Sequence, residues 1–192
     1  MTAKQMLVLG PGLACFIAFS WGTLRHFRSV GPMPLGMRLI GTVSLLTVTA
    51  FTWSVLASAL PGTWPVASIL SFGALALFTW AVRTTRHAGF ALAFAGAQPS
   101  RLLATGPFRY LRHPFYTSYL MFWLATCIAT TSSICILGSA ILWICDFVAA
   151  REEKRNISRT RLSAEYASYA LETGMFLPRF RLGCRWAPGP EV

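Results

Sequence analysis

The chain has 192 residues, of which 55% are hydrophobic and only 12% are charged, and its mean hydropathy is +0.55. A soluble domain is about 25% charged, so this composition excludes an ordinary soluble globule and a disordered chain. The net charge of +11 would suit a nucleic-acid partner, but the basic residues flank long uncharged runs, which argues against a nucleic-acid module.

The first two uncharged runs cover residues 5–24 and 39–82. A helix needs about 20 apolar residues to cross a bilayer, so the first run holds one span and the second holds two. A turn at Pro61-Gly62 divides the second run. The predicted spans lie near Gln5–Gly22, Leu39–Leu60 and Trp64–Val82.

The third uncharged run, residues 113–145, is shorter than two full spans and a loop. Two threonines and two serines at 130–133 lie near its middle and predict a tight hairpin. Its arms would be Pro114–Ala129 and Ile134–Ala150, each about 25 Å long at 1.5 Å per residue. The sequence therefore predicts an all-α integral membrane protein of about five transmembrane helices.

Basic residues predict the orientation, because lysine and arginine collect on the cytosolic side of a membrane. Segments 23–38, 83–113 and 151–185 hold 16 of the 17 Lys and Arg residues, and Lys4 is the exception. With five spans, this pattern places the N-terminus outside and the C-terminus in the cytosol.

The acidic residues are few, and all six lie at or after Asp146. Glu152 and Glu153 follow the last predicted span, and Glu153 lies nearly on the same helix face as Asp146, seven residues earlier. Two interpretations stay open: these acids hold a ligand, or the two glutamates pair with neighbouring basic residues at the interface.

The segment from Gly106 to Tyr116 reads GPFRYLRHPFY. Pro114 suits the first position of a helix, so Arg112 and His113 lie directly before the fourth predicted helix. A helix N-terminus offers free N–H groups to an anion, although a plain cap with Arg112 on a lipid phosphate is an equal alternative. Because the hairpin brings this segment and the acids to one membrane edge, the residues predict a site for a ligand that carries both charges.

The element Arg112-His113-Pro114-Phe115-Tyr116, followed after the hairpin by Glu152-Glu153, resembles the isoprenylcysteine carboxyl methyltransferase family. Membrane phosphatidylethanolamine N-methyltransferases are related to that family. The resemblance covers roughly residues 83–180 and includes flanking elements of similar character: Leu103–Tyr110, Glu165-Tyr166, Tyr169 and Phe176-Leu177-Pro178.

The resemblance implies S-adenosylmethionine as the cofactor, at the cytosolic end of the hairpin, and a lipidic or prenylated acceptor that arrives from the bilayer. No metal and no nucleic acid are expected. The implied cofactor-binding residues are Gly106, His113, Pro114, Phe115, Tyr116, Glu152 and Glu153; the implied catalytic residues are Arg112 and Glu153; the implied substrate-binding residues are Arg112, Arg151 and Tyr169.

Two positions depart from the family pattern. Ser118 stands where the family often has glycine, and Val148 and Ala149 stand where an arginine is expected about one turn before the glutamates. Which glutamate has which role therefore stays open. A phospholipid N-methyltransferase, a nicotinamide-dependent membrane reductase and a non-catalytic lipid-binding scaffold are the alternatives.

The remaining expectations concern organisation. We expect an N-terminal membrane region over 1–82, a methyltransferase core over 83–182 and a loose C-terminus over 183–192. Leu162, Tyr166 and Tyr169 fall at helical spacing and predict a short amphipathic helix, either on the membrane surface or as a lid over the cofactor.

Overall fold

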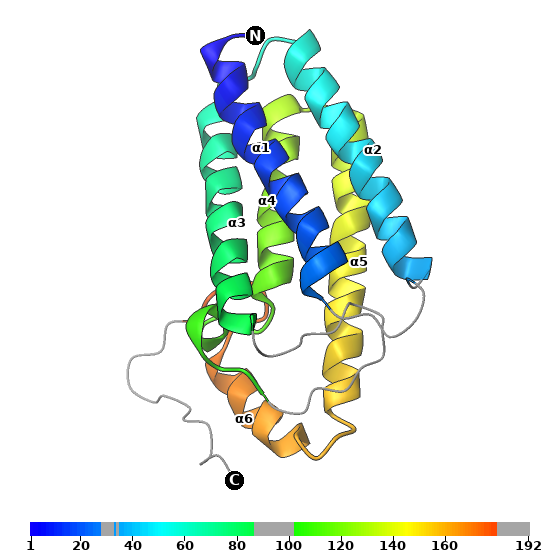
Figure 1. The fold of residues 1–192 in the computed structure, drawn as a ribbon, viewed down its shortest axis with the longest axis vertical. Helices are drawn as coiled ribbons and strands as arrows, with labels where there is room; N and C mark the ends of the chain where they lie inside the picture. Colours follow the sequence, from blue (N-terminus) through cyan, green and yellow to red (C-terminus); the bar gives the residue numbers. More distant parts are fainter. Residues whose placement is uncertain (28–32, 34, 87–101, 180–192) are drawn as a thin grey trace.

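The computed structural model describes residues 1–27, 33, 35–86 and 102–179. These residues form five long α-helices and one short one. The long helices lie side by side and the short one lies across one end (Figure 1). Apart from one isolated bridge, the elements of these residues are helical, so the prediction of an all-α fold is confirmed. The long helices are α1 (Ala3–Trp21), α2 (Leu35–Ala57), α3 (Trp64–Thr85), α4 (Pro114–Thr130) and α5 (Ser133–Ile157). The short elements are the π turn η1 (Gly22–His26), the 3-10 turn η2 (Gly106–Arg109) and the helix α6 (Ser163–Glu172).

Four of these helices are long and apolar enough to cross a membrane: α1 with its η1 extension, α2, α3 and α5. The prediction of an integral membrane protein is therefore confirmed. Helix α4 has 17 residues, which gives about 25 Å of rise, the length expected for an arm of the hairpin. That α4 forms a fifth membrane span stays a prediction.

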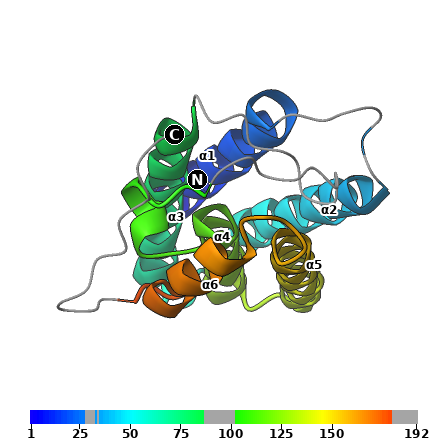
Figure 2. The same ribbon diagram turned by 90° about the horizontal axis from the view of Figure 1, so that it is seen from below.

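Helix α4 lies at the centre of the bundle, where it packs most extensively against α3 and also against α1, α2 and α5 (Figure 2). Most of its buried residues, such as Ser118, Phe122 and Ala129, recur at helical spacing on one side, and the opposite side carries no polar stripe. Pro114 at its first position starts the helix, and Thr131 in the left-handed conformation ends it. The N-terminal end of α4 is therefore held from several directions.

Small residues allow the helices to approach closely. A side chain at Gly138 of α5 would collide with Thr47 of α2, and one at Gly12 of α1 would meet Phe51 of α2 at 2.9 Å. Across the hairpin, the Ser139 hydroxyl donates to the Trp123 carbonyl at 3.2 Å. Such contacts are the usual means of helix association in membranes, and they fix which face of α5 turns inward.

Two predicted boundaries were wrong. Helix α2 begins at Leu35 and ends at Ala57 rather than covering 39–60, because Arg38 lies within its first turns and its long side chain can reach water. Helix α5 continues past Ala150 to Ile157, so Glu152 and Glu153 belong to the helix itself.

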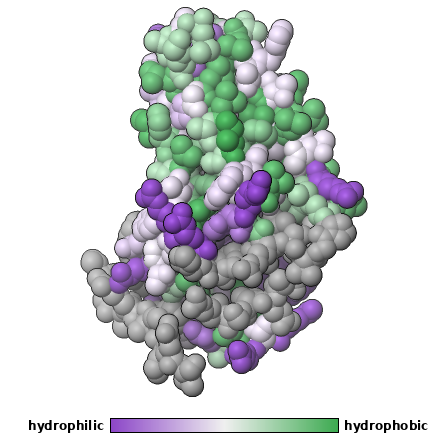
Figure 3. Space-filling view, in the orientation of Figure 1, coloured by the Kyte–Doolittle hydropathy of each residue, from purple (hydrophilic) through white to green (hydrophobic). Residues whose placement is uncertain are grey.

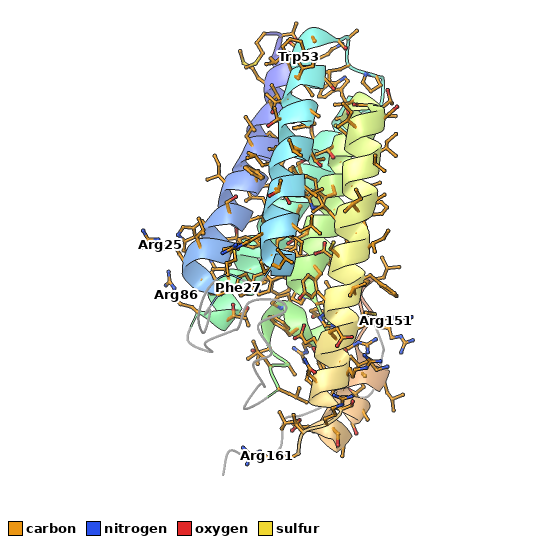
Figure 4. The ribbon with its side chains drawn as sticks, turned by 90° about the vertical axis from the view of Figure 1, so that its right-hand side faces the viewer. Arg25, Phe27, Trp53, Arg86, Arg151 and Arg161 are labelled. Carbon is orange, nitrogen blue, oxygen red and sulfur yellow. The ribbon has the colours of Figure 1, made fainter. Side chains whose placement is uncertain are left out.

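Charge separates the two ends of the bundle. Figure 4 shows Arg25, Arg86, Arg151 and Arg161 toward the end that holds α6, and Trp53 at the opposite end. Figure 3 shows apolar side chains over the upper part of one face and hydrophilic ones below them. Among the described residues, Lys4 is the one lysine or arginine on an element at the far end, which is the distribution the sequence predicted.

Candidate functional site

The candidate site lies at the α6 end of the bundle, where three segments meet around the start of α4. The segment after α6 runs beside the residues that precede α4. The Arg112 N–H donates to the Gly174 carbonyl at 2.8 Å, and the His113 N–H donates to the Met175 carbonyl at 3.3 Å. The approach to α4 is therefore fastened by backbone bonds to a segment about 60 residues later in the chain.

On its other side, the turn before α4 lies close to α3 and accepts a hydrogen bond from α6. Gly106 has a φ of +57°, and a side chain there would collide with Thr84 of α3. The Tyr169 hydroxyl of α6 donates to the Phe108 carbonyl at 2.6 Å, and this tyrosine is only 4% exposed. Two of the residues expected at the site, Gly106 and Tyr169, thus shape the turn that leads into α4.

The hairpin brings His113 and Glu153 together. His113 occupies the N-cap position of α4, and Glu153 lies near the end of α5. The His113 Nδ1 atom lies 3.4 Å from the Glu153 Oε2 atom. The histidine side chain is 6% exposed and the glutamate side chain is 44% exposed. The histidine is therefore buried, while the carboxylate remains partly accessible to solvent.

The two glutamates, which the sequence could not distinguish, face different ways. Glu152 forms an ion pair with Arg155 at 3.0 Å, and its side chain is 47% exposed, close to the 44% of Glu153. Glu153 instead shares the inward face of α5 with the buried residues Asp146 and Ala149. The partners, rather than the exposure, thus distinguish the two: Glu153 contacts His113 at the start of α4, and Glu152 contacts Arg155 on its own helix.

The two arginines expected at the site also differ. The Nε atom of Arg112 is buried, and no hydrogen-bond partner for it lies within the described part of the chain. Burial raises the pKa of the nearby Tyr166 hydroxyl, and the positive charge of Arg112 opposes part of that shift. Arg151 lies 4.5 Å over the ring of Phe147 and points away from the bundle in Figure 4.

Aromatic rings surround the histidine. The centroid of the His113 ring lies 5.5 Å from that of Tyr116 and 5.9 Å from that of Phe176. Ser118, one turn further into α4, is fully buried, and its hydroxyl donates to the Phe115 carbonyl at 2.6 Å. Pro114, Phe115 and Tyr116 form the first turn of α4 after His113, and of these Phe115 packs into the core against Phe78 and Phe108; their role as cofactor residues stays a prediction.

The sequence analysis grouped Asp146 with the two glutamates as acids that could hold a ligand, but it did not name Asp146 among the site residues. It lies on α5, about two turns further into the bundle than Glu153, and is 7% exposed. Its Oδ2 atom is buried and has no hydrogen-bond partner among the residues that the structure describes. Tyr116 and Tyr119 of α4 lie within electrostatic range of it. The available signal was its position: it is the first acid in the chain and ends an uncharged run.

These groups could hold a small ligand with both signs of charge. The first turn of α4 has no side-chain cap among the described residues, so the N–H groups that follow Pro114 are available to an anion. Arg112 supplies a guanidinium nitrogen without a partner within the described ranges, and Glu153 supplies a carboxylate. Within those ranges, no three His, Cys, Asp or Glu side chains gather as a metal ion would require.

A comparison with models of protein families gives a match. The family model described as phospholipid methyltransferase matches residues 63–160, just over half of the chain. The matched region contains α3, α4 and α5, and with them His113, Asp146 and Glu153. A search of the curated proteins finds no match.

Proposed function

Since the chain belongs to the phospholipid methyltransferase family, we propose that it transfers a methyl group from S-adenosylmethionine to a lipidic acceptor. The chain is an integral membrane protein of a methyltransferase family. The identity of the methyl donor, the residues that hold it and the acceptor belong to this proposal.

One observation carries the proposal: the contact of His113 with Glu153 at 3.4 Å, which joins the two arms of the hairpin beside the uncapped N-terminus of α4. S-adenosylmethionine bears a carboxylate, an ammonium group and a sulfonium. The α4 N–H groups and Arg112 match its anionic part, and Glu153 matches its cationic part. Tyr116 offers aromatic surface beside His113, whereas Phe115 is buried and packs against Phe78 and Phe108.

The bound cofactor would supply an already activated methyl carbon, whose bond to sulfur breaks with the electron pair left on sulfur as an acceptor lone pair attacks. The protein's task is then to position the acceptor and to exclude water. His113 and the first turn of α4 fix the site from one side, and the packed α5 fixes it from the other. Because α5 has exposed apolar side chains such as Ile144 and Phe147, an acceptor with lipid chains would enter from the bilayer.

We also propose that this site faces the cytosol, because the described arginines gather at its end of the bundle. The acceptor would then be a lipid of the cytosolic leaflet. Such a lipid would offer either a prenylated carboxylate, as in isoprenylcysteine carboxyl methylation, or the amine of a phospholipid.

Binding of S-adenosylhomocysteine to the detergent-purified protein, measured by calorimetry, tests the donor site. We expect micromolar binding that weakens at least about tenfold, or 1.4 kcal/mol, in Glu153→Gln. Glu165→Gln, which removes the same charge from α6, serves as the matched control and keeps wild-type affinity.

Three results would contradict the proposal. Binding of NADPH but not of S-adenosylhomocysteine would favour a membrane reductase. Binding of neither compound to a folded sample would favour a lipid-binding scaffold. Undiminished binding by Glu153→Gln would remove Glu153 from the site. A positive result leads to transfer of a labelled methyl group into extracted membrane lipids.

A further inference from the structure

A hydrogen bond joins the ends of α1 and α3 at the arginine-rich end of the bundle. His26 belongs to the π turn η1, which extends α1, and its Nε2 atom lies 2.8 Å from the Thr85 Oγ1 atom of α3. The Thr85 hydroxyl donates to the Ala81 carbonyl, so its oxygen accepts the Nε2–H of the histidine. The adjacent residues in the chain, Arg25 and Arg86, are therefore held on neighbouring elements.

Three exposed arginines lie around this hydrogen bond. Figure 4 shows Arg25 and Arg86 projecting from the same edge of the bundle, and Arg83 lies in the last turn of α3. We call these three residues the arginine edge. All six acids of the chain lie at or after Asp146, and the ion pairs among the described residues involve His113 and the end of α5. No ion pair within the described ranges therefore neutralises the arginine edge.

Apolar side chains lead from the arginine edge toward the middle of the bundle. Ile17, Trp21 and Leu24 recur at helical spacing along α1 and η1, and all three are exposed. The Trp21 ring stacks on that of His26, with the centroids 6.0 Å apart. Tryptophan prefers the level of the headgroups in a bilayer. This side of the bundle thus offers guanidinium groups at headgroup level and an apolar strip at the level of the lipid chains.

The charge of the arginine edge favours an anionic headgroup. A phosphodiester accepts strong, charge-assisted hydrogen bonds from guanidinium groups, and basic clusters at a membrane surface attract anionic lipids. A zwitterionic headgroup also brings a cationic group, which would lie among like charges. Free phosphate would match the arginines but would leave the apolar strip of α1 without a partner.

We propose that the arginine edge binds an anionic phospholipid, with its phosphate between Arg25 and Arg86 and its chains along Ile17, Trp21 and Leu24. This site involves other residues than the candidate site around His113. The inference does not depend on the proposed methyl transfer.

A lipid bound here would fasten α1 to α3 behind the start of α4. The Phe115 ring in the first turn of α4 lies 5.0 Å from the Phe27 ring and 6.1 Å from the His26 ring, measured between centroids. A headgroup that bridges Arg25 and Arg86 would hold these rings in place. At ten times its dissociation constant, the lipid should raise the unfolding temperature by about 3–6 °C.

The test is a calorimetric titration of the detergent-purified full chain with short-chain lipids. The probes are dihexanoyl phosphatidylglycerol, which is anionic, and dihexanoyl phosphatidylcholine, which has the same chains and phosphate but a cationic group. Each basic residue near a membrane surface contributes about 1 kcal/mol, so phosphatidylglycerol should bind at least about tenfold more tightly than phosphatidylcholine. Inorganic phosphate should bind at least about tenfold more weakly than phosphatidylglycerol, because it has no chains.

Two pairs of substitutions locate the site. Arg25→Gln with Arg86→Gln removes two exposed charges and should weaken phosphatidylglycerol binding at least about tenfold, while phosphatidylcholine binding stays within about threefold of wild type. Arg159→Gln with Arg161→Gln removes two exposed arginines beyond α5 and serves as the matched control, which should keep wild-type affinity for both lipids.

Four results would overturn the inference. The first is equal binding of the two lipids by the wild-type protein. The second is undiminished phosphatidylglycerol binding by the variant without Arg25 and Arg86. The third is an equal loss in the control variant, because overall positive charge would then explain the binding. The fourth is inorganic phosphate that binds as tightly as phosphatidylglycerol, because the site would then recognise an anion and not a lipid.

Discussion

Gly106 offers a sharp test of how the approach to α4 is held. Its φ of +57° lies in the left-handed region, and a side chain there would meet the Thr84 side chain, whose Cγ2 atom would lie 3.0 Å away. The Gly106→Ala substitution therefore combines two costs. The backbone conformation costs about 1–2 kcal/mol for a residue with a Cβ atom. Overpacking against Thr84 adds about 1–3 kcal/mol, so we expect a total loss of about 2–5 kcal/mol.

A double-mutant cycle separates the two costs. Thr84 is half-buried, and its hydroxyl donates within its own helix to the Trp80 carbonyl at 2.9 Å. Thr84→Ala alone should therefore change the free energy of unfolding by less than about 0.5 kcal/mol. In the double variant the collision is relieved and the backbone cost remains. The coupling between the two positions should therefore be about 1–3 kcal/mol.

The assay is thermal unfolding in detergent with a thiol-reactive dye, because Cys15 and Cys135 are buried and become reactive when the bundle opens. At about 2–4 °C per kcal/mol for a chain of this size, Gly106→Ala should unfold about 4–20 °C below wild type. The double variant should unfold only about 2–8 °C below wild type. Equal unfolding temperatures of Gly106→Ala and wild type, or no recovery in the double variant, would refute the contact between this turn and α3.

Four further predictions follow from individual contacts. Glu152→Gln breaks an exposed ion pair worth at most about 1 kcal/mol, so calorimetry should find S-adenosylhomocysteine affinity within threefold of wild type. Tyr169→Phe leaves a buried backbone carbonyl without its donor, and the loss of about 1–3 kcal/mol should lower the unfolding temperature by about 2–12 °C. Asp146→Leu removes a buried polar group that has no partner among the described residues, and the same assay should show a rise of similar size. A cysteine at Gly62 should react with an impermeant maleimide on intact cells, and one at Asn156 should react only after permeabilisation, because the arginine-rich end is expected in the cytosol.

Much of the bundle could be predicted from where charges are missing. The uncharged run 113–145 and its Thr-Thr-Ser-Ser centre predicted the hairpin, and α4 and α5 confirm it. The same criterion misplaced α2, because it treated Arg38 as lying outside the span. A long basic side chain can reach the interface from within a helix, so a charge near the end of a span does not mark where the helix begins.

The site was predictable in outline and not in detail. A hairpin with arms of similar length must bring its two outer ends together, so the meeting of the His113 segment with the glutamates followed from chain length alone. The choice between Glu152 and Glu153 depends on the rotation of α5, which close approaches such as Gly138 against Thr47 decide. The bond from Tyr169 to the Phe108 carbonyl joins residues 61 positions apart, and helical spacing shows only that Tyr169 lies on the apolar face of α6.

Asp146 shows why a sequence cluster can mislead. Along the chain it groups with Glu152 and Glu153, and pairing with the neighbouring arginines is the simplest expectation. The chain has 17 basic residues against six acidic ones, so a cation for any acid at this end should be easy to supply. Glu152 takes one, yet within the described residues Asp146 has none and lies buried beside hydroxyl groups. The difference arises because Asp146 lies about two turns further into the bundle than Glu153, on the buried face of α5, whereas Glu152 meets Arg155 at the exposed end of that helix.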